Sequence, residues 1–327
     1  MSKYRYRLPQ LKEDALFMTD GGLETTLIFD NGIDLPYFAA FHLLRDDAGT
    51  DILRRYFERY ARTAVKHGVG LILESPTWRA NTDWAGKLGY DVQTLADVNR
   101  KSIGLMLEVR AAHETATSKM VISGALGPRG DGYKADRRMT IDEARAYHAV
   151  QIETFAQTDA DMVTAFTMNY VEEAIGVVRA AQESRMPVAI SFTLETDGRL
   201  PSGDSLASAI ATPDAASDGY PAYYMINCAH PTHFDHVLNR GDAVVNRIRG
   251  LRANASRRSH AELDESTDLD AGNPTELGQQ HVQLKAQLPG LSVVGGCCGT
   301  DHRHVQAMFE SLLSARSMAP VRRVMPQ

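Results

Sequence analysis

The sequence alternates short β-branched or apolar runs with longer amphipathic segments along most of its length. We predict eight strands, at residues 16–19, 69–74, 119–123, 162–166, 187–194, 222–227, 248–253 and 291–294. Alternation of this kind is typical of a parallel sheet whose strands are connected by helices.

The segments between these runs carry apolar side chains at helical spacing. Residues 52–65 follow this spacing and end at Gly68, which suits the position after a helix. Thr140 and Glu143 form a capping-box pattern before a helix that extends to about Thr158. Further helices are predicted over 95–117, 171–185, 232–238, 275–288 and 300–315, with a weaker signal over 205–211.

Eight β units, each followed by a helix, predict a single (β/α)₈ TIM barrel domain over residues 1–327. The chain has no Pro/Ser-rich linker and no abrupt change of composition that would favour two domains. The alternative is a doubly wound sheet with insertions. In a barrel, the long segments 30–49 and 254–273 would lie at the C-terminal face of the strands, where barrel active sites form.

The composition of the chain indicates which kinds of molecule it binds. The chain has 327 residues and a formal net charge of −6, with no long Lys/Arg block, which argues against nucleic acid or an anionic membrane as the main partner. We therefore expect small-molecule partners, a cytoplasmic protein without signal or membrane span, and compatibility with a homo-oligomer. Because the three cysteines include an adjacent pair, a disulfide framework is improbable.

All three cysteines come just after a predicted strand. Cys228 follows residues 222–227, and Cys297 and Cys298 follow the last strand, so a barrel would place them on one face. Three thiolates with an open fourth position describe a catalytic zinc site, and sulfur ligands favour Zn²⁺ over Mg²⁺ or Ca²⁺. Taken alone, Cys228 would more often be a buried core residue than a metal ligand. The glycines around the adjacent pair instead favour close approach of a ligand.

These residues carry a family resemblance. The GGCCG segment at 295–299, together with Asn227-Cys228 and Asp20-Gly21-Gly22, resembles the homocysteine S-methyltransferase family, which includes betaine:homocysteine and S-methylmethionine:homocysteine methyltransferases. The resemblance implies a (β/α)₈ barrel in which Cys228, Cys297 and Cys298 bind zinc and the acceptor thiol becomes the fourth ligand.

The resemblance also assigns substrate-binding residues. Asp20 and Gly21 match the strand-one motif of the family's amino-acid acceptor site, although a turn residue followed by a glycine with positive φ would give the same pattern. Asn227 and Asn254 match asparagines at the ends of strands six and seven, where loop capping is the other interpretation.

Strand four departs from the family pattern. An acidic residue usually ends this strand and holds the acceptor's ammonium group, whereas this chain has Phe166. Either another carboxylate takes over, with Asp20, Glu24 or Glu195 as candidates, or the acceptor differs. The ring of Phe166 could instead contact a methylated cation. The polar run 256–270 does not map onto the family pattern.

Other residues near these motifs have ordinary explanations. The nearby histidines are expected to be surface or capping residues rather than metal ligands, and they are His230, His233, His236, His302 and His304. Core packing is expected for four aromatic residues: Trp78, Trp84, Tyr37 and Phe38. The alternative is that they form a wall of the site around a methylated cation.

Together, these features predict a zinc-dependent S-methyltransferase. It would move a methyl group from a small sulfonium or quaternary ammonium donor to a zinc-bound thiol, with homocysteine as acceptor and methionine as product. The sequence ends one helix after the cysteine pair, so we expect no added folate or cobalamin module. Three alternatives stay open: a different thiol acceptor, methyl transfer from a corrinoid protein partner, and a non-catalytic zinc or thiol redox sensor.

Overall fold

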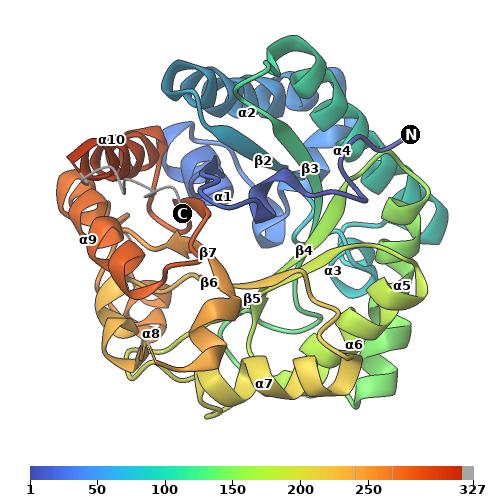
Figure 1. Cartoon of the computed structure of the whole chain (residues 1–327). Coiled ribbons are helices and arrows are strands. Elements are labelled where there is room, and N and C mark those ends of the chain that lie inside the picture. Colours follow the sequence, from blue (N-terminus) through green and yellow to red (C-terminus); the bar gives the residue numbers. More distant parts are fainter. Residues whose placement is uncertain (240, 267, 319–327) are drawn as a thin grey trace.

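Eight parallel strands close into a barrel in sequence order (Figure 1). The structure is a computed structural model that describes residues 1–239, 241–266 and 268–318. The strands are β1 (Phe17–Met18), β2 (Gly70–Glu74), β3 (Met120–Leu126), β4 (Met162–Met168), β5 (Val188–Thr193), β6 (Tyr223–Asn227), β7 (Ile248–Ala253) and β8 (Val293–Gly296). Because β1 pairs with both β2 and β8, the barrel prediction is confirmed and the doubly wound alternative is wrong.

Helices surround the barrel (Figure 1). They are α1 (Leu23–Thr25), α2 (Asp47–His67), α3 (Thr82–Gly86), α4 (Val92–His113), α5 (Ile141–Ala156), α6 (Val171–Glu183), α7 (Leu206–Ser217), α8 (His260–Asp264), α9 (Pro274–Gln287) and α10 (His302–Met318). The predicted end of α2 at Gly68 is confirmed by its left-handed backbone, and the predicted capping box of Thr140 and Glu143 starts α5.

Two helix predictions differ from the structure. The predicted helix 232–238 is wrong, because two 3₁₀ turns, Pro231–His233 and Asp235–Val237, replace it. Phe234 separates them with non-helical φ and ψ of −137° and −9°, and its ring is buried. The weak signal at 205–211 is the start of the longer α7, which Ser205 caps. The predicted domain 1–327 includes residues 240, 267 and 319–327, which lie outside the described residues.

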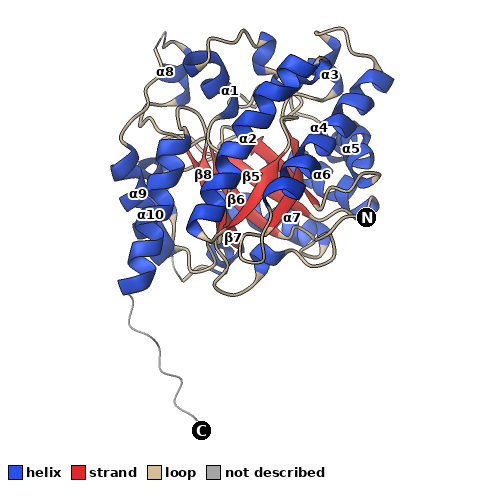
Figure 2. Ribbon diagram, turned by 90° about the horizontal axis from the view of Figure 1, so that it is seen from above, coloured by secondary structure: helices blue, strands red, loops and turns tan. Residues whose placement is uncertain are grey.

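Short helices gather at one end of the barrel. Figure 2 shows α1, α3 and α8 on the same side of the strands. Each of them follows the carboxyl end of a strand, so this is the face where barrel active sites form. Within the described residues, no helix is both long and apolar enough to span a bilayer.

Candidate active site

A cavity of about 430 Å³ opens at the carboxyl ends of the strands. Phe38 from the predicted loop 30–49 lines it, as do His260, Asp264 and Asp270 from the predicted loop 254–273. All six residues with a predicted substrate role also line it: Asp20, Gly21, Glu24, Phe166, Asn227 and Asn254. The structure therefore brings the predicted residues together around one space.

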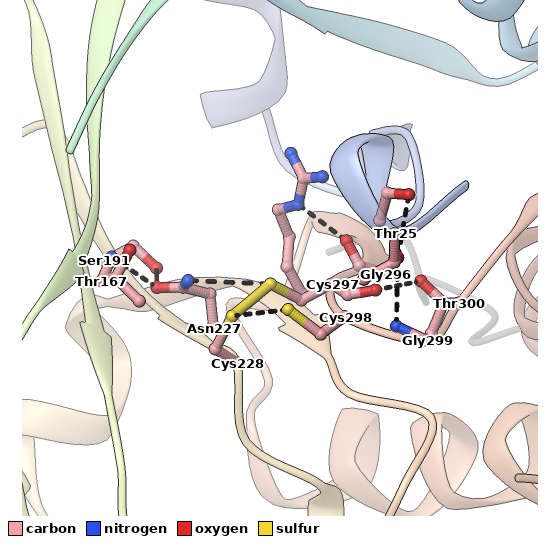
Figure 3. The surroundings of a disulfide bond; sticks show 12 residues. Thr25, Thr167, Ser191, Asn227, Cys228, Gly296, Cys297, Cys298, Gly299 and Thr300 are labelled. Carbon is pink, nitrogen blue, oxygen red and sulfur yellow. Dashed lines mark hydrogen bonds between the residues drawn. A yellow bond between two sulfur atoms is a disulfide. The ribbon is translucent and has the colours of Figure 1, made fainter. Parts of the chain in front are cut away.

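The three cysteines converge at this cavity. Cys228 follows β6, while Cys297 and Cys298 follow β8, and their sulfur atoms all lie within 4.8 Å of one another (Figure 3). Among the described residues, these cysteines form the one group of His, Cys, Asp or Glu side chains close enough to hold a metal ion. None of the five histidines named above belongs to it.

Two of these cysteines are joined. Cys228 and Cys297 form a disulfide, and Cys298 stays free with its sulfur 3.8 Å from that of Cys228. The sequence argued against a disulfide framework, and this single disulfide was not predicted. The physical reason is the convergence of β6 and β8, which brings two thiols to bonding distance although they are 69 residues apart. In the reduced protein, the same convergence offers three soft sulfur donors on one side of the cavity, which suits zinc.

Hydrogen bonds fix the backbone beside the sulfurs. Thr167 and Cys228 have left-handed φ values of 56° and 52°, which cost a non-glycine residue about 1–3 kcal/mol each. The side-chain oxygen of Asn227 accepts hydrogen bonds from the Thr167 amide at 3.0 Å and from Ser191 Oγ at 2.6 Å. Its Nδ2 lies 4.0 Å from the sulfur of Cys297 (Figure 3). Asn227 thus connects β4, β5 and β6 at the sulfur cluster.

Arg252 of β7 pairs with the strand-one carboxylate. One guanidinium nitrogen lies 2.8 Å from Oδ1 of Asp20, and Asp20 Oδ2 accepts a hydrogen bond from Tyr56 at 3.1 Å. Arg252 also donates to the carbonyls of Gly21 and Gly296, and it lies over the ring of Phe166 at 5.1 Å. Burial lowers the pKa of Arg252, but the nearby carboxylates outweigh this effect and the net shift is upward. The cation over the Phe166 ring is therefore Arg252, a residue of the protein, rather than a bound ligand.

Gly21 is required by close packing. Its φ is not positive, so the positive-φ interpretation is wrong. A Cβ there would lie 2.8 Å from both the Thr300 carbonyl oxygen and the Tyr60 hydroxyl. By contrast, Gly299 beside the cysteine pair does have a positive φ of 76°.

Tyr133 and His260 cover the sulfurs. The Tyr133 hydroxyl lies 3.4 Å from the sulfur of Cys228 and 3.6 Å from that of Cys298. Its ring packs on His260 at 4.2 Å, and His260 Nε2 donates to the carbonyl of Cys228 at 2.6 Å. Burial raises the pKa of the Cys298 thiol. Tyr133, from a loop, and His260, from the start of α8, thus contact the cluster from outside the barrel strands.

The predicted aromatic wall has a different role. Trp78 and Trp84 hold the guanidinium of Arg79 between them, with ring distances of 3.9 and 4.0 Å. The core-packing interpretation is wrong for Tyr37 and Phe38, which are 49% and 46% exposed at the rim. The tryptophans therefore position a protein cation that lines the cavity.

Several residues of the cavity were not identified from the sequence, among them Glu74, Arg79, Tyr133, Arg252 and His260. For Glu74 and Arg252 a signal existed, since each is a charged residue at or near the carboxyl end of an apolar run. Tyr133 lies in a loop and His260 begins the short helix α8, so neither has such a local signal.

The closed parallel barrel, with three sulfur atoms over the carboxyl ends of its strands, makes this a TIM-barrel protein with a candidate metal site. The profile of the homocysteine S-methyltransferase family matches residues 17–312, and the chain belongs to this family, as the resemblance predicted. Selenocysteine Se-methyltransferase from Brassica oleracea var. italica is 22% identical, over 94% of this chain and 92% of that protein.

Solved structures share the fold. The oxidized form of the homocysteine methyltransferase MmuM from Escherichia coli matches with a TM-score of 0.73 and 20% identity, over 96% of this chain and 100% of that one. Its metallated form matches with a TM-score of 0.68 and 19% identity, over 91% of this chain and 96% of that one. At these identities, the likeness shows the fold alone.

Proposed function

We propose that this chain transfers a methyl group from a small cationic donor to the sulfur of a thiol acceptor, with homocysteine as the acceptor and methionine as the product. The observation that carries the proposal is the convergence of three cysteine sulfurs at the cavity of a barrel from this family. Cys228, Cys297 and Cys298 would hold zinc once the disulfide is reduced.

Bound zinc would supply a Lewis acid that lowers the pKa of the acceptor thiol and keeps it ionised at neutral pH. This ionisation contributes only about 2 kcal/mol, since a free thiol has a pKa near 8.5. Holding the acceptor sulfur and the methyl carbon in line can contribute roughly 7–11 kcal/mol. The main task of the surrounding residues is therefore to position the two substrates.

The cavity suits a cationic donor. Among the described residues that line it are seven carboxyl groups, at Asp20, Glu24, Glu74, Asp131, Asp264, Asp268 and Asp270, and two guanidinium groups, at Arg79 and Arg252. This excess of acidic groups favours a sulfonium or quaternary ammonium compound. As the acceptor sulfur forms its bond to the methyl carbon, the donor's C–S or C–N bond breaks and its electron pair stays on a neutral leaving group. No acid is needed to protonate that group.

One observation favours a second candidate function. The Cys228–Cys297 disulfide could serve a thiol redox sensor that performs no turnover. The two functions differ in a simple way, because a sensor would bind zinc and oxidise reversibly without producing a methylated thiol.

A panel experiment tests the proposal. Reduced, zinc-loaded protein is incubated with homocysteine, cysteine or a simple alkyl thiol, each with S-methylmethionine or betaine, and products are identified by mass spectrometry. We expect methionine from homocysteine without added cobalamin or folate. Methyl transfer only when a corrinoid protein is added would overturn the small-donor proposal. The absence of any methylated thiol, with or without such a protein, would favour the sensor.

A further inference from the structure

One cavity carboxyl group has no use in the sulfur chemistry. Glu74 ends β2, is 4% exposed and lines the cavity. Its Oε1 accepts a hydrogen bond from Thr164 Oγ1 at 3.1 Å, whereas Oε2 has no hydrogen-bond partner among the described residues. Leaving a buried carboxylate oxygen unpaired is costly. A donor from a ligand would remove this cost.

The strand-one carboxylate is already paired. Asp20 Oδ1 lies 2.8 Å from the guanidinium of Arg252 and Oδ2 accepts a hydrogen bond from Tyr56, so a cation of the protein already faces this carboxylate, although Oδ1 accepts no hydrogen bond among the described residues. Phe166 supplies no charge at the end of β4. A cationic group of the acceptor therefore needs a different anion.

Glu74 contacts β4 at Thr164, two residues before Phe166. Thr164 and Phe166 are two residues apart on β4, so their side chains point to the same face of the strand. Because Thr164 donates to Glu74, the carboxyl group extends from β2 across β3 towards that face of β4. An acidic group from β2 thus contacts the strand face on which β4 carries Phe166 in place of an acidic residue.

We propose that Glu74 binds the ammonium group of an α-amino-acid acceptor and so selects amino-acid thiols over thiols without an amine. The assignment rests on the proposed function, since it names the feature of the acceptor that this site recognises. In the family pattern an acidic residue of strand four contacts the ammonium group, whereas in this chain the contact would come from Glu74 of β2.

The environment of Glu74 predicts that binding of an ammonium group releases protons, which can be measured. Burial raises the pKa of Glu74 to about 7, with Arg252 opposing the shift and Asp20 adding to it. The other polar groups that face it are Ser123 of β3, Thr164 of β4 and Tyr223 of β6. A bound ammonium group stabilises the ionised carboxylate. Binding near pH 7 should therefore release about half a proton from Glu74.

Calorimetry with the thioether product tests the assignment without turnover. Methionine is compared with 4-(methylthio)butanoate, which lacks only the amino group, and neither compound has a thiol proton to lose. In the wild type we expect methionine to bind about tenfold or more tightly than the analogue, and to release protons in buffers of different ionisation enthalpy.

Three variants complete the test. Glu74→Gln should abolish both the preference for methionine and the proton release, while binding of 4-(methylthio)butanoate stays within about twofold. Glu74→Asp, which keeps the charge, should retain part of the preference. Glu24→Gln, the other carboxyl group with a pKa raised by burial to about 7, should retain it.

The outcomes separate the two proposals. A preference that survives Glu74→Gln, that is lost in Glu24→Gln instead, or that is absent from the wild type would overturn the ammonium assignment. Equal weakening of both ligands by Glu74→Gln would also overturn it, because it would show a structural role. Failure of methyl transfer in the panel experiment affects the proposed function and leaves this binding comparison intact.

Discussion

At the scale of single residues, Phe166 shows how a pocket residue can act through a neighbour. Its ring lies under the buried guanidinium of Arg252. A cation–π contact of this desolvated kind contributes roughly 0.5–2 kcal/mol. We expect Phe166→Leu to lower the free energy of unfolding by about 1 kcal/mol and to leave zinc bound, as measured by chemical denaturation and elemental analysis.

The alternative for Phe166 has a distinct outcome. If the ring contacts the donor instead, Phe166→Leu would raise the donor's KM several-fold while stability stays unchanged. That result would contradict the packing role described here and would return Phe166 to the donor site.

The residues found from the sequence were those whose chemistry follows from type and strand position. The cysteines and Asp20 come directly after strands, so a barrel brings them to one face. What could not be predicted is which charges pair there. Arg252 and Asp20 are separated by most of the chain, and nothing in their local sequence identifies them as partners.

At the scale of elements, Asn227 connects three strands beside the sulfur cluster. Asn227→Ala leaves the Thr167 amide and the Ser191 hydroxyl unpaired and frees the strained backbone at Cys228. We expect zinc affinity to fall about 10–100-fold, as for other residues that orient metal ligands. Competition with a chromophoric chelator measures this.

A matched control is Ser191→Ala, which removes one of the two hydrogen bonds to the Asn227 oxygen and should have a smaller effect. Unchanged zinc affinity in Asn227→Ala would show that the strand ends hold the cysteines without it.

The acidic segment around α8 should attract cationic donors. Asp264 and Asp268 line the cavity, and Asp270 accepts a hydrogen bond from Ser256 within the loop. We expect Asp264→Asn with Asp268→Asn to lower kcat/KM for a cationic donor several-fold and to flatten its dependence on ionic strength. Asp270 is kept to preserve the loop. Steady-state kinetics at several salt concentrations measure this effect. If kcat/KM depended on salt equally in the double variant and the wild type, these carboxylates would not attract the donor.

Strands and long helices followed from periodicity, and short elements did not. The predicted and observed bounds of β7 agree, because its apolar run is clearly delimited. Helices α1, α3 and α8 have only three to five residues, which is too short for a 3.6-residue period to show. The predicted helix 232–238 was wrong because burial of the Phe234 ring decided the backbone there.

At the scale of the whole molecule, the buried charge of Glu74 should reduce stability at neutral pH. Burial raises its pKa to about 7 in the folded chain, above the ordinary value of 4.5. Because the unfolded chain ionises more readily, the contribution of this group to stability is fully present below pH 4.5 and is lost as pH rises towards 7. The loss is on the order of 1 kcal/mol per pH unit.

Thermal unfolding of ligand-free protein between pH 5 and pH 8 tests this. Glu74→Gln should have a higher Tm than the wild type at pH 8, and the difference should shrink at pH 5. A Tm difference that does not change with pH would show that the pKa of Glu74 is not raised in the folded chain. A gain in stability from removing a cavity carboxylate is expected where function requires a buried charge.

The barrel topology was predictable because alternating strands and helices allow few arrangements. The disulfide was not, since the closeness of the sulfurs of Cys228 and Cys297 depends on how β6 and β8 meet across β7. The same closeness of the sulfurs is the observation behind the proposed zinc-dependent methylation of a thiol.

The most direct test is to remove zinc and return it. Protein is treated with reductant and chelator, and the rate of methionine formation from homocysteine and S-methylmethionine is measured with reductant alone and with reductant plus zinc. We predict a rate near zero with reductant alone, and recovery only after about one zinc binds per chain. Replacing any one of the three cysteines with Ala should prevent that recovery. A full rate in the zinc-free reduced protein would show that the reaction does not need zinc, and full recovery in all three variants would show that these cysteines do not hold it.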